Sequence, residues 1–312
     1  MIKRNYLWAA ALLLGLASCE SQEVQNVSES NDDLLAVQIE AAISSGSAAR
    51  SESEVGKTAF ADTDELGLFA FGNTSVSKWT YSSSTWSAES RLYWPTKSTE
   101  YTFYAFYPYD ENATLTSVPM PDLTTQDGTF SESNDFIVAS KTCSYNSTTD
   151  GLVSFSGDDA FKHVYSMLTL AFTNGVDESL TLSSVTASLE GMMTQCYYNF
   201  KNGAAEESET AVDGITFSGL SQVIESDGTY SLVFLTNAVA TSGNLTITIV
   251  YTRETTTYTA TAEVSITGLE ASTHYTLSLN IAKNELTLEV IDIEDWVDSD
   301  MDGVTLTEEV SE

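Results

Sequence analysis

Hydrophobic residues alternate with polar ones along most of this chain, with the period of two that is typical of half-buried β-strands. The alternation is clearest early on, where Val37, Ile39, Ala41 and Ile43 would share one face of a strand at residues 35–43. Short runs rich in aromatic and β-branched residues follow at 66–71, 101–107, 136–139, 168–172, 180–189, 230–235, 245–251, 258–266, 275–281 and 286–293. Turn-forming residues separate these runs and helical periodicity is scarce, so we expect an all-β protein.

The number of expected strands is too large for one sandwich. We therefore expect two antiparallel β-sandwich domains, at residues 34–160 and 161–296. Residues 19–33 are polar and acidic without periodicity, which predicts a flexible tether, and residues 297–312 form an acidic tail. The chain shows no repeat of fixed short period, which disfavours a propeller or a solenoid.

The first nineteen residues have the order of an export signal. Lys3 and Arg4 precede an apolar run at 7–16, and at about ten residues this run is too short to span a bilayer. The sequence Leu-Ala-Ser-Cys that ends at Cys19 resembles the bacterial lipobox, in which signal peptidase cuts before the cysteine, whose thiol and new amino group then receive acyl chains. We expect loss of residues 1–18 and an outer-membrane lipid anchor, palmitate included, on Cys19. The alternative is an ordinary secretory signal with a chance cysteine.

The chain is strongly acidic. It has 45 acidic and 12 basic residues, and loss of Lys3 and Arg4 with the signal leaves 10 basic residues and a net charge of −35. Such a charge repels nucleic acid, which we exclude as a partner. With Cys19 lipidated, Cys143 and Cys196 remain in an oxidising compartment, where they could form a disulfide if the fold brings them together.

Catalytic signatures are missing from the sequence. The only two histidines, His163 and His274, are more than a hundred positions apart, so a catalytic triad lacks its base. There is no Gly-x-Ser-x-Gly elbow, Gly-rich phosphate loop or Cys/His metal cluster. Abundant acidic residues without defined spacing do not indicate a glycosidase. We expect neither an enzyme nor a bound organic cofactor.

Several aromatic-rich segments occur in a characteristic order: Glu65–Phe71, Trp79 with Trp86, Leu92–Pro95, Phe103–Tyr109, Asp135–Ala139 and Phe161–Ser166. Together with the lipobox, and up to Trp296, they resemble the fimbrillins, the type V pilins of Gram-negative anaerobes. The resemblance implies two β-sandwich domains of transthyretin-like topology. It also implies a cell-surface fimbrial subunit or adhesin, in a stalk, tip or anchor position that the sequence does not specify.

Arg50 lies in a segment of small and polar residues, 44–56, directly after the first expected strand. It is the first basic residue after Arg4. In fimbrillins, cleavage there removes the first strand and opens a hydrophobic groove for a strand of the next subunit. The resemblance therefore implies Arg50 as the maturation site and other pilin subunits as partners through strand exchange. The alternative is an arginine in a solvated loop.

The acidic tail has the spacing of a calcium-binding loop, with oxygen ligands at Asp298, Asp300, Asp302 and Glu309 and a glycine at the sixth position. A calcium loop of this kind normally lies between two helices, whereas a strand is expected before this tail. Two alternatives remain, a solvated tail and a donor strand in which residues 304–306 supply inward side chains. Calcium is the one metal cofactor that the sequence suggests.

A carbohydrate-binding surface lipoprotein is the competing function. Trp79, Trp86 and Trp94, with neighbouring tyrosines, could form a platform for stacking sugar rings of a host or bacterial surface ligand. Core packing is the simpler interpretation of these residues. The first two tryptophans would be exposed only if they lie on an open hairpin around residues 81–85.

Overall fold

The computed structural model describes residues 35–44, 56–208, 214–283 and 285–295. All of them fall within one compact unit of the chain. The regular structure is almost entirely β-strand, so the expected all-β sandwich class is confirmed. The division near residue 160 stays a prediction.

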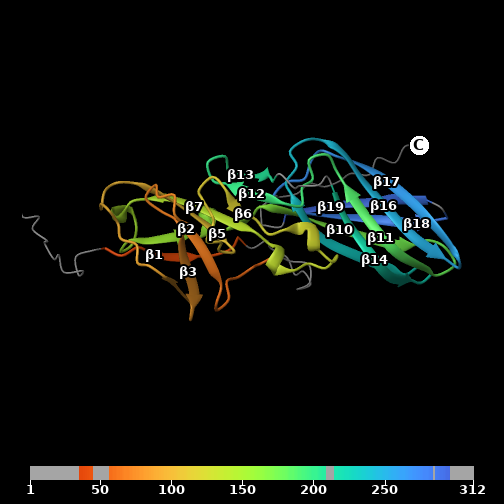
Figure 1. Ribbon diagram of the computed structural model, residues 1–312, viewed down its shortest axis with the longest axis horizontal. Coiled ribbons are helices and arrows are strands. Elements are labelled where there is room, and N and C mark those ends of the chain that lie inside the picture. Colours follow the sequence, from red (N-terminus) through yellow and green to blue (C-terminus); the bar gives the residue numbers. More distant parts are fainter. Residues whose placement is uncertain (1–34, 45–55, 209–213, 284, 296–312) are drawn as a thin grey trace, which may run out of the picture. The chain divides into compact units, whose positions relative to one another are not determined.

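The strands within the described ranges are distributed over five sheets (Figure 1). Their bounds in chain order are β1 (Gln38–Ala41), β2 (Glu65–Phe69), β3 (Ser77–Ser82), β4 (Thr85–Ala88), β5 (Tyr101–Tyr107), β6 (Val118–Pro119), β7 (Ile137–Cys143), β8 (Leu152–Phe155), β9 (Lys162–His163), β10 (Tyr165–Asn174), β11 (Leu180–Ser188), β12 (Cys196–Asn199), β13 (Ala204–Glu207), β14 (Gly214–Ile224), β15 (Thr229–Asn237), β16 (Gly243–Arg253), β17 (Thr256–Ile266), β18 (Thr273–Ala282) and β19 (Glu285–Asp295). The described residues also include the 3-10 helices η2 (Leu123–Thr125), η3 (Glu132–Asn134), η4 (Tyr145–Ser147) and η5 (Gly157–Asp159).

The first part of the chain is built on an antiparallel sheet of six strands in the order β4-β3-β2-β5-β7-β9. Its central strands bury side chains on both faces. On one face, Leu68 and Phe103 join a hydrophobic cluster with residues of β1 and β8. On the other face, Phe69 and Phe106 join a second cluster that includes Tyr198 of β12. Burial on both faces explains why these strands are continuously apolar rather than strictly alternating.

The second part of the chain forms two sheets of four strands, β15-β10-β18-β19 and β14-β11-β16-β17. The inward residues of both sheets, among them Leu170, Val185, Ile247 and Leu277, form one large buried cluster. β10 and β18 pair in parallel, unlike the other pairs of these two sheets. The long stretch of chain between β10 and β18 provides the crossover that a parallel pair needs, whereas neighbouring strands joined by short turns can pair only antiparallel.

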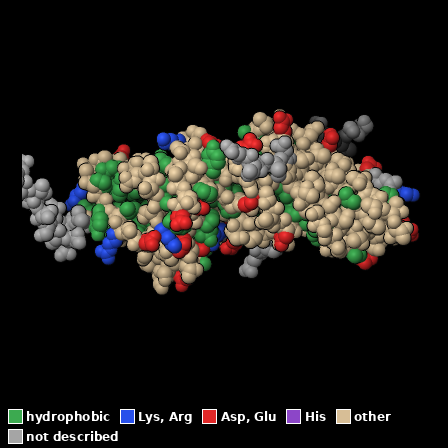
Figure 2. Space-filling model, in the orientation of Figure 1, with side chains coloured by type: hydrophobic (Ala, Val, Ile, Leu, Met, Phe, Trp, Pro, Cys, Tyr) green, Lys and Arg blue, Asp and Glu red, His purple; other side chains and the backbone are tan. Residues whose placement is uncertain are grey.

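Threonine and serine side chains occupy many of the outward positions of the strands. Thr102 pairs with Thr142 across the first sheet at 2.8 Å, and Thr248 pairs with Thr261 across β16 and β17 at 3.1 Å. On the face shown in Figure 2, acidic side chains are scattered between broad areas that carry no charge. Hydroxyl pairs of this kind stabilise neighbouring strands.

Candidate functional site

Main-chain hydrogen bonds hold β1 on one edge and the residues directly before it on the other edge. On one edge β1 pairs in parallel with β8. On the other edge, the amide of Val37 donates to the carbonyl of Leu92, and the amide of Trp94 donates to the carbonyl of Leu35, both at 2.9 Å. Beyond the strand, the amide of Ser44 donates to the carbonyl of Phe161 at 2.9 Å. Removing residues 35–44 would thus leave unpaired backbone groups on both sides.

The side chains of β1 and its flanks follow the alternation that the sequence predicts. Val37, Ile39 and Ile43 are buried, Ala41 is partly buried, and the residues between them are mainly exposed. The three buried residues belong to the same hydrophobic cluster as Phe155 of β8 and residues of the six-stranded sheet. β1 therefore fills a groove that has an apolar floor and hydrogen-bonding edges.

The chain is fixed again at Lys57. Its amide donates to Asp135 Oδ2 at 3.0 Å, and its Nζ lies 3.0 Å from Asp64 Oδ2. Burial alone would lower the pKa of Lys57, but the hydrogen bond and the charge of Asp64 outweigh it and raise the pKa, so the ammonium group stays charged at neutral pH. Asp135 is fully buried and also meets His163 Nδ1 at 2.9 Å. Residues 45–55 are thus preceded by Ser44, which is bonded to Phe161, and followed by Lys57, which is bonded to Asp135.

Most of the site residues suggested by the sequence lie outside the described residues. These are the lipidation site Cys19, the cleavage site Arg50 and the four calcium ligands Asp298, Asp300, Asp302 and Glu309. Their roles stay predictions. What the structure adds is the setting of Arg50, which lies in sequence between Ser44, bonded to Phe161, and the buried Lys57.

The disulfide that Cys143 and Cys196 could have formed is not present. Both are buried free thiols, and they belong to different hydrophobic clusters on the two faces of the six-stranded sheet. Burial raises the pKa of both thiols, that of Cys196 to about 12. Both side chains act as small apolar core residues, so the pairing that the sequence left open is not formed in the structure.

The proposed tryptophan platform is also wrong. Trp79 and Trp86 lie on the β3–β4 hairpin, as considered from the sequence, but they are 2% and 9% exposed. Trp94 is 6% exposed, and its indole nitrogen donates to the carbonyl of Gly151 at 3.1 Å. All three belong to the cluster that receives β1, because the hairpin turns its aromatic face towards the core. Their rings pack in the cluster that contacts β1 and are therefore not accessible to a sugar.

The remaining chemical groups form no reactive arrangement in the described part of the chain. His163 contacts Asp135, and His274 Nε2 lies 2.8 Å from Thr169 Oγ1, so the two histidines occupy separate structural contacts. No group of three or more potential metal ligands occurs among the described residues. Within the same residues, no helix has the length and apolar character required to span a membrane.

Comparisons with known proteins agree with this fold. A family described as fimbrillin-like matches residues 50–296. A fimbrial protein from Bacteroides vulgatus is similar in structure with a TM-score of 0.53 and 18% identity, covering 74% of this chain and 93% of that protein. A protein from Bacteroides uniformis, named as a candidate for cell adhesion, gives a TM-score of 0.55 and 17% identity over 85% of this chain and 99% of its own. No curated protein is significantly similar in sequence.

Proposed function

Since the chain belongs to the fimbrillin-like family, we propose that it is a fimbrial subunit of the cell surface that assembles by donor-strand exchange. The observation that carries the proposal is the position of residues 35–44, whose backbone is bonded to neighbouring segments on both sides and whose alternate apolar side chains lie in the core. A strand held in this way can be replaced by another extended segment with the same alternation, because the edges supply hydrogen bonds and the groove supplies pockets. The family supports a structural role rather than catalysis.

In this proposal, cleavage after Arg50 is the step that permits exchange. Before the cut, β1 is joined to the rest of the subunit and fills the groove from within, at a high effective concentration. After the cut, β1 is held only by non-covalent contacts and can dissociate, because the effective concentration that the linker maintained is lost. Dissociation uncovers three buried aliphatic side-chain sites, each worth about 1.5–3 kcal/mol of burial. A donor strand from a neighbouring subunit recovers this free energy.

The C-terminal tail of a neighbouring copy offers a suitable donor. Its segment 304–310, Val-Thr-Leu-Thr-Glu-Glu-Val, has apolar residues at its first, third and seventh positions. Segment 37–43, Val-Gln-Ile-Glu-Ala-Ala-Ile, has its buried residues at the same three positions. The fifth position is Glu308 in the tail and Ala41 in β1, the only one of the four inward positions that is not fully buried. The carboxylate would therefore fall where the groove is most open to water.

Competition by a synthetic peptide tests the exchange. A peptide of residues 35–44, added in excess to cleaved protein, should occupy the groove and stop polymerisation. A control peptide with Val37→Asp and Ile39→Asp should have no effect, because it places two carboxylates in apolar pockets. Polymer length is measured by electron microscopy and size-exclusion chromatography. Equal polymerisation with both peptides would contradict strand exchange at this groove.

The lipid anchor is tested at Cys19. We propose that, as the lipobox indicates, the exported precursor begins there and is held in the outer membrane by its acyl chains until cleavage after Arg50 separates the subunit from them. Cys19→Ala should abolish labelling with palmitate and move the protein from the membrane fraction to the soluble fraction, because multiple acyl chains are what makes such attachment stable. A Cys19→Ala protein that remains membrane-bound and palmitate-labelled would disprove the assignment.

A further inference from the structure

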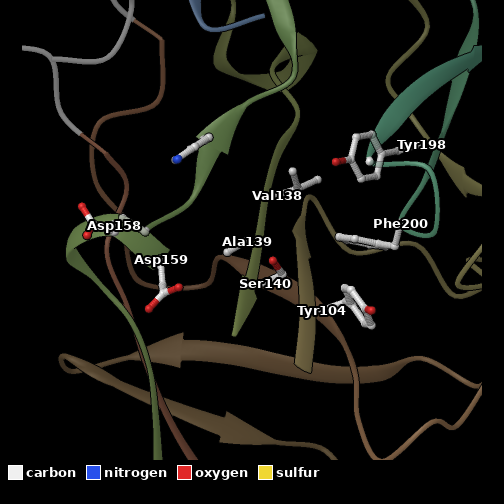
Figure 3. Close-up of a pocket in the computed structure, with 11 residues that line it drawn as sticks. Tyr104, Val138, Ala139, Ser140, Asp158, Asp159, Tyr198 and Phe200 are labelled. Atoms are coloured by element: carbon white, nitrogen blue, oxygen red, sulfur yellow. The ribbon is translucent and has the colours of Figure 1, made fainter. Parts of the chain in front are cut away.

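A pocket of about 280 Å³ lies on the face of the six-stranded sheet opposite the β1 groove (Figure 3). Its floor is formed by β5 and β7, where Tyr104 and Ser140 are direct cross-strand partners. Tyr198 and Phe200, from β12 and the turn after it, form one wall, and Asp158 and Asp159 of η5 form the opposite wall. The aromatic rings and η5 thus lie on opposite sides of a pocket that is open to solvent.

The hydroxyl of Tyr198 is the most informative group in this pocket. Tyr198 as a whole is 8% exposed, and it lines the pocket. Figure 3 shows its oxygen pointing into the pocket. Burial raises the pKa of Tyr198, so the group stays a protonated donor at neutral pH. This oxygen is not among the buried polar atoms without a partner in the described part of the chain, so it is accessible to solvent in the pocket and can donate to a bound molecule.

The aromatic wall is compact and held in place by its own contacts. The rings of Tyr198 and Phe200 meet edge to face with centroids 5.0 Å apart, and those of Phe200 and Tyr104 are 5.2 Å apart. Tyr104 is partly exposed to the pocket, and Ser140 adds a hydroxyl on the same face. An apolar wall with a few fixed polar groups is the usual composition of a small-molecule site.

The charges in the pocket indicate the class of ligand. Asp159 is paired with Lys141, whereas Asp158 is exposed and makes no ion pair among the described residues. Lys162 is the only basic side chain in the lining. Because the mature chain carries a net charge of −35, anionic ligands are repelled. A neutral molecule with hydroxyl groups and an apolar face fits the aromatic wall, the phenol and the carboxylate together.

We propose that this pocket binds one ring of a neutral saccharide, with an apolar face of the sugar against the aromatic wall and hydroxyl groups bonded to Tyr198 and Asp158. A second hollow of about 890 Å³ shares Val138, Lys162 and Tyr198 with the first and is lined mainly by small residues. It provides room for the next ring, so the preferred ligand is an oligosaccharide rather than a monosaccharide.

Glycan binding by the uncleaved monomer tests this proposal without any need for polymerisation. The mature chain, residues 19–312 without lipid, is applied to an array of neutral and acidic glycans, and affinities for the bound glycans are measured by calorimetry. Tyr198→Phe removes only the hydroxyl and should weaken binding about two- to tenfold, the effect of one hydrogen bond. Tyr197→Phe is the matched control, because Tyr197 lies on the opposite face of β12, and it should bind as wild type does. Asp158→Asn should also weaken binding.

Three outcomes would overturn the proposal: no glycan bound at all, binding restricted to acidic glycans, or equal affinities for the wild type and Tyr198→Phe. Thermal melting of each variant shows whether a loss of binding reflects unfolding. Because Tyr198→Phe keeps the ring that packs against Phe200, its melting temperature should stay close to that of the wild type.

Discussion

Replacing Arg50 with alanine is expected to leave the subunit as a monomer under conditions in which the wild type polymerises, a loss of polymer of more than tenfold. Arg50 is the only basic residue between β1 and Lys57. Lys57 is 3% exposed and its amide is bonded to Asp135. A protease therefore cannot bind the chain around Lys57 as an extended substrate. Without a cut at Arg50, β1 stays joined to the subunit and continues to fill the groove.

The matched control for Arg50→Ala is Arg91→Ala. Arg91 is an exposed arginine next to Leu92, which bonds to the flank of β1. If an arginine-specific protease acted there instead, Arg91→Ala would be the variant that blocks assembly. We expect Arg91→Ala to be cleaved and to polymerise as the wild type does. Both variants are treated with the same protease, the new N-terminus is identified by mass spectrometry, and filaments are counted by electron microscopy. Equal polymer from Arg50→Ala and the wild type would refute the maturation step.

Strands that bury one face were the most predictable part of this fold. The alternation at residues 37–43 predicted β1 and its buried positions, and β16 and β17 were predicted in the same way, because a period of two is a property of the local sequence. β14 was not predicted. Gly219 interrupts it with a positive φ of 71°, so its apolar residues do not keep one register along the strand.

The pairing of strands could not be predicted in the same way. β1 pairs with β8, and the two strands are separated by more than a hundred residues, so no local pattern relates them. The burial of Trp79 and Trp86 also depends on which face of the β3–β4 hairpin meets the core. The hairpin itself could be predicted from its serine-rich turn, but the direction of its aromatic face is set by the strands that pack against it.

The anchor at Lys57 is a further feature that the sequence did not indicate. Lys57 and Asp135 are 78 positions apart, and a lysine in a polar segment would ordinarily be assigned to the surface. Asp135 did belong to a segment that resembles the fimbrillins, and that resemblance was the only signal for it. Its structural role became clear only with its contacts.

Asp135→Ala is expected to lower the free energy of unfolding by about 2–5 kcal/mol, because each buried donor left without an acceptor costs about 1–3 kcal/mol. The carboxylate of Asp135 accepts the amide of Lys57 and contacts His163 Nδ1, and it is fully buried, so water cannot replace it without a change in packing. Asp135→Asn keeps one acceptor oxygen and should be destabilised about half as much. Asp177→Ala removes an exposed carboxylate and should change stability by less than about 0.5 kcal/mol.

Urea denaturation of these three variants, followed by circular dichroism, provides the test. The expected order of stability is wild type and Asp177→Ala, then Asp135→Asn, then Asp135→Ala. In Asp135→Ala the amide of Lys57 no longer has a fixed acceptor, so the backbone at Lys57 should open more easily. Hydrogen exchange at the Lys57 amide should therefore accelerate more in Asp135→Ala than at amides in the centre of β16, which lies in a separate hydrophobic cluster. If Asp135→Ala unfolds at the same urea concentration as Asp177→Ala, the buried anchor does not stabilise the fold.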